Sequence, residues 1–190
     1  KEQEKLEKEL CERADKLSKA RKESALKMQT EVTAELKSLG MKSASFVIKI
    51  DALGLENRTV KGFDRVEFMF SANLGEEVKP LKAVASGGEI SRFMLAVKNI
   101  TAKIEGISTL IFDEIDTGVS GMMALVLGEK LCKVSSFAQV ICVTHLAQVA
   151  SFGKTHFLIE KSEKDGRTLT SVYPLDKQGR VKEIARLVSG

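Results

Sequence analysis

The sequence predicts an α/β fold in which a largely parallel sheet with flanking helices follows one long N-terminal helix. No Pro or Gly interrupts residues 1–39, where charged residues of both signs surround sparse apolar positions. From Thr109 onward, apolar strands alternate with helical patterns, and this order is typical of a parallel sheet. Two of these strands end at Asp113-Glu114 and at His145, and parallel strands bring such ends to one ligand-binding edge.

Residues 1–40 are predicted to form the end of a coiled coil, and residues 41–190 a separate lobe. A helix of this length would extend roughly 60 Å, and Gly40 would cap its C-terminus. Its apolar stripe is too thin to stabilise a lone helix, so we expect a partner helix from outside the chain or from a second copy. The alternative is a solvated helix at the edge of a domain. The stripe consists of Leu6, Leu10, Leu17, Met28, Val32 and Leu39.

Period-two alternation predicts two half-buried strands, at residues 46–50 and 66–70, with turns near Gly62 and at residues 71–75. A loop from Pro80 then leads to a helix that begins after Ser86, with apolar positions Ile90, Met94, Val97 and Ile104. The next elements are a strand at 109–113, a loop bracketed by Gly118 and Gly121, and a helix at 122–134. A strand at 139–144 follows and is expected to be buried on both faces. The chain then continues with a short helix at 146–151, strands at 155–161 and 168–173 joined by an Asp165-Gly166 turn, and a helix at 177–188.

Composition narrows the class of protein. The net charge of +4 permits contact with nucleic acid without demanding it, because basic and acidic residues are interleaved. Cys11, Cys132 and Cys142 are odd in number and widely spaced, and Cys132 and Cys142 lie in apolar runs. This favours buried free thiols in a reducing compartment over a disulfide framework or a zinc site. No apolar run approaches the roughly 18 residues needed to cross a bilayer, and no signal peptide is visible. We therefore expect a cytoplasmic protein without membrane contact. Because the chain lacks an initiator Met and starts within a helical pattern, we expect it to be a piece of a longer protein.

The start of the helix after Ser86 has the features of an anion site. The Ser86 hydroxyl can cap the helix, and Glu89 three residues later would complete a capping box. Gly87 and Gly88 carry no side chains that would block the exposed amides, and these amides favour an anion together with the helix dipole. The alternative is an ordinary capped helix, which the Ser-Gly-Gly-Glu sequence alone favours.

The two strand ends carry the candidate catalytic residues. Asp113 suits Mg²⁺, directly or through water, and Glu114 could polarise a water molecule. His145 could hydrogen-bond a γ-phosphate or orient the attacking water. The alternatives are a strand end that reaches solvent and a satisfied core histidine, and His156 is interpreted as structural.

One apparent phosphate-binding motif is rejected. Gly153-Lys154-Thr155 resembles the end of a P-loop, but that motif needs an earlier Gly where Gln148 stands and a helix afterward. No complete Walker A sequence occurs in the chain.

Taken together, residues 85–89, 110–114 and 143–145 resemble, in the correct order, the signature motif, Walker B motif and switch histidine of an ATP-binding-cassette (ABC) ATPase. The finer resemblance is to the structural-maintenance-of-chromosomes (SMC)-like branch, and within it to bacterial proteins that repair DNA. The stretches that carry this finer resemblance are residues 84–92, 112–121 and 144–150.

The resemblance implies that the chain is the C-terminal lobe of an ABC/SMC-type P-loop ATPase head with the adjoining end of a coiled coil. The N-terminal lobe, which carries Walker A, would be the missing partner, and ATP and Mg²⁺ the cofactors. Asp113, Glu114 and His145 would serve the nucleotide bound in cis. The signature residues would contact a nucleotide held in trans by a second head, and the D-loop would lie between the heads. These residues are Ser86, Gly87, Gly88 and Glu89 for the signature, and Asp116, Thr117, Gly118, Val119 and Ser120 for the D-loop.

Two positions depart from the common ABC pattern, namely Ala85, where Leu is usual, and Ser120, where Asp is usual.

The resemblance further implies a bacterial, nucleoid-associated ATPase that acts in double-strand break repair and recombination, with head–head engagement of a homodimer and with DNA as a partner. This chain alone would be inactive because Walker A is absent. The alternatives are a non-catalytic coiled-coil interaction module and a head lobe from another ABC ATPase, Rad50-like or transporter. Transporter heads do not follow a long charged helix such as residues 1–39.

Overall fold

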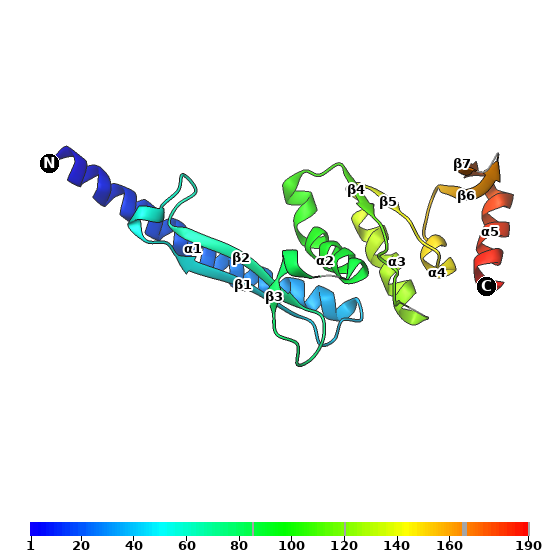
Figure 1. The fold of residues 1–190 in the computed structure, drawn as a ribbon, viewed down its shortest axis with the longest axis horizontal. Coiled ribbons are helices and arrows are strands. Elements are labelled where there is room, and N and C mark those ends of the chain that lie inside the picture. The colour runs from blue at the N-terminus through cyan, green and yellow to red at the C-terminus, as the bar shows by residue number, and fades with distance from the viewer. Residues whose placement is uncertain (85, 120, 165–166, 190) are drawn as a thin grey trace. The chain divides into compact units, whose positions relative to one another are not determined.

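The computed structural model describes residues 1–84, 86–119, 121–164 and 167–189. The chain divides into two compact units, Lys1–Ser86 and Gly87–Gly190, whose elements are labelled in Figure 1. The long helix and the first strands therefore belong to one unit, whereas the sequence predicts a division near residue 40. The assignment of residues 1–40 to a coiled coil stays a prediction.

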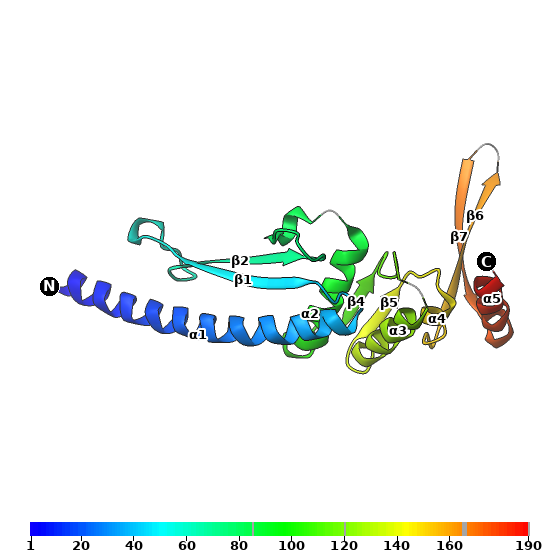
Figure 2. The same cartoon turned by 90° about the horizontal axis from the view of Figure 1, so that it is seen from below.

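The first unit consists of one long helix and a small antiparallel sheet. Helix α1 spans Glu2–Ser38, strand β1 spans Ser45–Ala52, β2 spans Asp64–Ser71 and the short β3 spans Lys79–Pro80, with single 3₁₀ turns at Leu55–Asn57 and Leu81–Ala83. The strands are hydrogen-bonded in the order β1-β2-β3. Figure 2 shows α1 running alongside the β1–β2 hairpin.

Helix α1 ends as the sequence predicts. Gly40 adopts a φ of 82°, the left-handed region that favours glycine. The amide of Gly40 donates to the carbonyl of Lys37, and the amide of Met41 donates to the carbonyl of Leu36. These two bonds form a Schellman motif, which satisfies carbonyls that the helix itself leaves free.

The apolar stripe of α1 is covered along only part of its length. Val32 and Leu39 are buried, and the Gln29 side chain accepts a 2.7 Å hydrogen bond from the Ile48 amide of β1. By contrast, Leu6 and Leu10 are 59% and 43% exposed. The chain's own sheet thus covers the later part of the stripe, a role that sequence analysis gave to a partner helix, and leaves the first part bare.

The β1–β2 hairpin has the alternation that the sequence predicts. Phe46 pairs with Phe70 and Ile48 with Phe68, which places the apolar side chains of both strands on one face. The rings of Phe46 and Phe68 meet edge to face at 5.6 Å.

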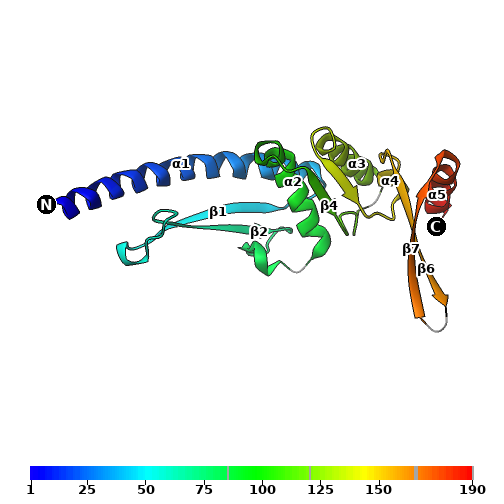
Figure 3. The same cartoon turned by 90° about the horizontal axis from the view of Figure 1, so that it is seen from above.

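The described part of the second unit contains eight elements, in an αβαβα order followed by a hairpin and a final helix. They are α2 (Gly87–Glu105), β4 (Thr109–Phe112), α3 (Met122–Val134), β5 (Gln139–Cys142), α4 (Ala147–Ala150), β6 (His156–Lys164), β7 (Arg167–Leu175) and α5 (Lys177–Ser189). Strands β4 and β5 are parallel, whereas β6 and β7 form an antiparallel ribbon beside α5 (Figure 3). The predicted elements are therefore present, in a mixed arrangement of sheets. The Asp165-Gly166 turn lies outside the described residues.

Burial in the second unit differs from the sequence prediction at two places. Ile104 of the predicted helix stripe is 86% exposed, while Phe93, Leu95 and Ala96 fill the core. Strand β5 is not buried on both faces, because Ile141 is 45% exposed. Ile111 of β4, which pairs with Ile141, is also exposed. One face of the β4–β5 pair is covered and the other is bare.

The cysteines are free, as expected, but the burial of Cys132 was predicted wrongly because this side chain is exposed. Burial raises the pKa of the Cys142 thiol to about 12, so this thiol stays protonated and unreactive at neutral pH.

None of the described helices combines the length and apolar character required to traverse a lipid bilayer.

Because some leucines of α1 are buried and others are exposed, replacing them by alanine should lower the stability of the chain by different amounts. Leu36→Ala should lower the free energy of unfolding by about 2–5 kcal/mol, because Leu36 is fully buried and its loss leaves a cavity. Leu26→Ala on the same helix is the matched control, since Leu26 is 65% exposed. Urea unfolding of the chain followed by circular dichroism measures both; equal losses would show that the sheet does not cover α1.

Candidate functional site

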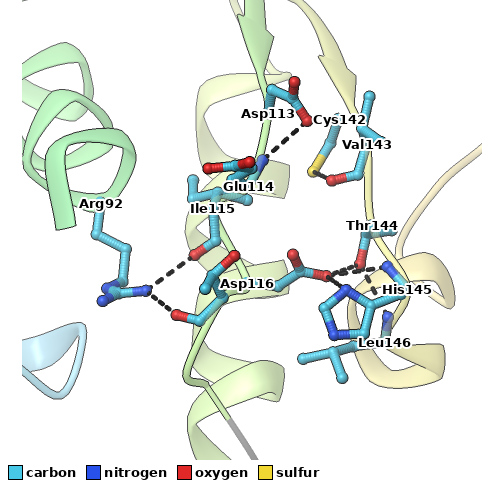
Figure 4. Close-up of polar contacts among 11 residues, drawn as sticks. Arg92, Asp113, Glu114, Ile115, Asp116, Cys142, Val143, Thr144, His145 and Leu146 are labelled. Atoms are coloured by element: carbon cyan, nitrogen blue, oxygen red, sulfur yellow. Dashed lines mark hydrogen bonds and ion pairs between the residues drawn. The ribbon is translucent and has the colours of Figure 1, made fainter. Parts of the chain in front are cut away.

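The parallel pairing of β4 and β5 brings the predicted catalytic residues to one edge. Phe112 pairs with Cys142, and the Val143 amide continues the pairing with a 3.0 Å hydrogen bond to the Phe112 carbonyl. The residues that follow, Asp113-Glu114 on one strand and Thr144-His145 on the other, leave the sheet at the same side, as Figure 4 shows. The structure thus confirms the juxtaposition that the sequence predicts, while the roles of these residues stay predictions.

Asp113 lies at the exposed end of β4, and its carboxylate turns back onto the chain. One oxygen accepts a 3.0 Å hydrogen bond from the Glu114 amide. Among the described residues, no group of three or more His, Cys, Asp or Glu could enclose a metal ion. Mg²⁺ is usually held by one or two carboxylates together with phosphate oxygens and water, so a single exposed Asp fits this ion.

Glu114 is held in an unusual backbone conformation. Its φ of 56° lies in the left-handed region, which costs a non-glycine residue about 1–2 kcal/mol. The carbonyl of Glu114 accepts a 3.1 Å hydrogen bond from the Thr117 amide, which closes a tight turn directly after β4. The turn aims the Glu114 side chain at the first residue of α2, where a Cβ on Gly87 would collide with the carboxylate.

Gly88 has a similar packing constraint. A Cβ there would lie 3.0 Å from the Thr117 Cβ and 3.1 Å from the Glu114 carbonyl oxygen. The two glycines therefore allow the first turn of α2 to contact the loop after β4. Sequence analysis explained this pair only by its exposed amides and missed the packing constraint.

The signature and D-loop predictions are only partly within the described structure. Ser86 belongs to the other compact unit, and Ala85 and Ser120 lie outside the described residues. The capping box of Ser86 with Glu89 stays a prediction.

Asp116 is 2% exposed and points into the unit. Its Oδ2 accepts hydrogen bonds from the Thr144 hydroxyl at 2.5 Å and from the His145 amide at 3.0 Å. The Nδ1 atom of His145 lies 3.3 Å from the same oxygen, while the His145 side chain is 70% exposed. Sequence analysis assigned Asp116 to a D-loop between two heads, and that role stays a prediction; in the structure its carboxylate lies beside His145 (Figure 4).

Ser91 and Arg92 of α2 donate hydrogen bonds to the loop that follows β4. The Ser91 hydroxyl donates to the Asp113 carbonyl at 2.8 Å. The Arg92 guanidinium donates to the carbonyls of Ile115 at 3.3 Å and Thr117 at 2.7 Å. Burial lowers the pKa of Arg92, with Glu89 acting in the opposite direction, but a guanidinium remains charged at neutral pH. Sequence analysis quoted both residues within a motif and gave neither a role.

The Arg92 contacts predict a stability effect. Arg92→Met keeps much of the apolar stem but leaves two backbone carbonyls without their donor, which should reduce the free energy of unfolding by about 1–3 kcal/mol. Arg186→Met is the matched control, because Arg186 is exposed and pairs with Glu183 one helical turn away. Urea unfolding should separate the two variants; an Arg92→Met variant as stable as the control would mean that this contact does not hold the loop.

Comparison with known proteins was made for both sequence and structure. No family model matches the chain. Its sequence is similar to DNA repair protein RecN from Bacillus subtilis (43% identity, covering 96% of this chain and 34% of the relative), from Halalkalibacterium halodurans (44%, covering 92% and 31%) and from Haemophilus influenzae (41%, covering 93% and 32%). The chain spans about a third of the length of these curated relatives.

Two solved structures illustrate the likeness of fold. One is the Smc head domain with a coiled coil and joint from Pyrococcus yayanosii, with a TM-score of 0.57 and 17% identity over 88% of this chain and 30% of the other. The second is a chain from work on ATP-driven dimerization and DNA-stimulated activation of SMC ATPases, with a TM-score of 0.50 and 19% identity over 90% of this chain and 97% of the other. At these identities the likeness shows the fold alone, which is that of part of an SMC head domain.

Proposed function

Because the chain belongs to the RecN family of SMC-like DNA repair proteins, we propose that it forms the C-terminal lobe of an ATPase head. The whole protein would bind and hydrolyse ATP to drive head–head engagement during repair of DNA double-strand breaks. The observation that carries this proposal is the edge at which β4 and β5 end. It gathers Asp113, Glu114 and His145, which are the residue types that phosphoryl transfer needs.

The chemistry assigned to this edge rests on positioning and charge. Mg²⁺ at Asp113 would neutralise charge on the nucleotide phosphates. The Glu114 carboxylate would accept a proton from the attacking water or orient that water, and its fixed backbone turn supports a defined position. His145 would contact the γ-phosphate or the same water, and its 70% exposed side chain is accessible to either.

The start of α2 is proposed to serve a second nucleotide. Helix α2 begins at Gly87, so the amides at its N-terminus and the helix dipole favour a phosphate group there. By family resemblance that phosphate belongs to ATP held by the Walker A motif of a partner head. One lobe would then contribute to two nucleotide sites, and the protein would act as a homodimer through its heads.

The bare face of β4–β5 supports the proposed partner lobe. Ile111, Ile141 and Val143 are 69%, 45% and 46% exposed, and they lie in or directly after the paired strands β4 and β5. Covering apolar side chains such as these is favourable by about 25 cal/mol per Å². We propose that the N-terminal Walker A lobe of the same protein covers them, and that the 190-residue chain alone has negligible ATPase activity.

The remaining partners are proposed from the family. DNA would be the substrate of the whole protein, and the cytoplasm, at the nucleoid, its location. The net charge of +4 is compatible with DNA contact, but the interleaved charges indicate no particular DNA-binding residues.

The proposal is tested by Glu114→Gln in the full-length protein. The variant should bind ATP as the wild type does and hydrolyse it about 10²–10⁴-fold more slowly, because the amide cannot accept the proton of the attacking water. Glu129→Gln on the exposed side of α3 is the matched control and should leave turnover unchanged. Steady-state ATPase assays with a parallel nucleotide-binding measurement distinguish the effects; wild-type turnover in Glu114→Gln would remove Glu114 from this role.

A further inference from the structure

Asp116 is an unusual residue in this unit because its carboxylate is almost entirely buried, at 2% exposure. An ionised carboxylate inside a protein is unfavourable unless hydrogen-bond donors surround it. The donors in this structure come from the segment after β5 and are the hydroxyl of Thr144 and the amide of His145, while the Nδ1 atom of the His145 ring lies 3.3 Å from the same carboxylate oxygen. The burial of Asp116 is therefore tied to the position of His145, 29 residues later in the chain.

The contact between Asp116 and the His145 ring has a direct chemical consequence. An ionised carboxylate can only accept hydrogen bonds, so an Asp116 oxygen 3.3 Å from Nδ1 favours a ring that carries its proton on Nδ1. In that tautomer of the neutral ring, Nε2 is the unprotonated nitrogen. The amide of His145 is bound to the same carboxylate oxygen, so the backbone and the ring of His145 are held together.

Asp116 is itself held on both sides. The Arg92 guanidinium binds the carbonyls of the residues before and after it, Ile115 and Thr117 (Figure 4). The amide of Val119 donates to the Asp116 carbonyl at 3.0 Å. Because its neighbours are fixed to α2, the Asp116 carboxylate has a defined direction toward His145.

We propose that Asp116 is a positioning residue that sets the orientation and tautomer of His145, and that Arg92 holds Asp116 in place from α2. This inference rests on the proposed function of His145 at the nucleotide. It connects helix α2, whose first turn is proposed to contact one nucleotide, with His145, which is proposed to act at the other nucleotide. The contacts of Arg92 and Asp116 form this connection.

A double-mutant cycle in the full-length protein tests the proposal. Asp116→Asn should lower kcat for ATP hydrolysis roughly 10–100-fold with little change in KM, as expected when an orienting partner of a functional histidine is lost. In a His145→Ala background the same substitution should have no further effect, because Asp116 acts through His145. Equal losses of kcat in both backgrounds, or no loss in either, would overturn the proposal.

Arg92→Lys provides a second variant should Asp116→Asn fold poorly. Lysine keeps the charge and a terminal donor, but its shorter, non-planar head cannot reproduce the position from which the Arg92 Nη1 atom donates to both carbonyls, so kcat should fall in the wild-type background and not in His145→Ala. A loss of the same size in both backgrounds would contradict the proposed role of Arg92.

A readout independent of hydrolysis separates this inference from the proposed function. Diethyl pyrocarbonate acylates the unprotonated nitrogen of a neutral imidazole, and peptide mass spectrometry measures the rate at His145. Asp116→Asn should slow this reaction several-fold relative to wild type, because an amide can donate to Nδ1 and move the ring proton to Nε2. An unchanged rate would overturn the inference even if Glu114→Gln abolishes turnover, and a slowed rate would support it even if Glu114→Gln does not.

Discussion

The parallel, in-register pairing of β4 with β5 is the constraint on which the candidate site depends. Because Phe112 lies opposite Cys142, the two chains leave the sheet together, and their next residues meet at one edge. A slip of one residue would reverse which side chains face the core and would move His145 relative to Asp116. The buried Asp116 carboxylate then joins the two chains, since each of its side-chain contacts reaches across from the β4 side to the β5 side.

A second set of contacts joins this edge to α2. The glycines at the start of the helix permit close approach to the loop after β4, and Arg92 binds two carbonyls of that loop. A side chain at Gly88 would press against the backbone of that loop, whereas one at Gly87 would displace the Glu114 carboxylate. Gly88 thus satisfies a packing requirement inside this lobe, in addition to the nucleotide contact that we propose for the start of α2.

Sequence periodicity and strand ends were sufficient to predict the elements and the meeting of Asp113, Glu114 and His145, because both follow from local pattern and parallel order. Burial was harder to predict, because it depends on what covers each face. The apolar run at residues 139–144 predicts a strand buried on both faces, yet Ile141 is exposed. The inward position of Asp116 could not be read from its motif, since its partners lie 28 and 29 residues away.

The central claim is that this chain supplies half of a nucleotide site and that another lobe of the same protein supplies the rest. The most direct measurement is to mix the purified chain with the N-terminal, Walker A-bearing lobe and to follow ATPase activity and ATP-dependent dimerisation. The account predicts that neither part hydrolyses ATP alone and that the mixture gains both activities. Robust turnover by this chain alone, or a mixture that assembles and stays inactive, would contradict it.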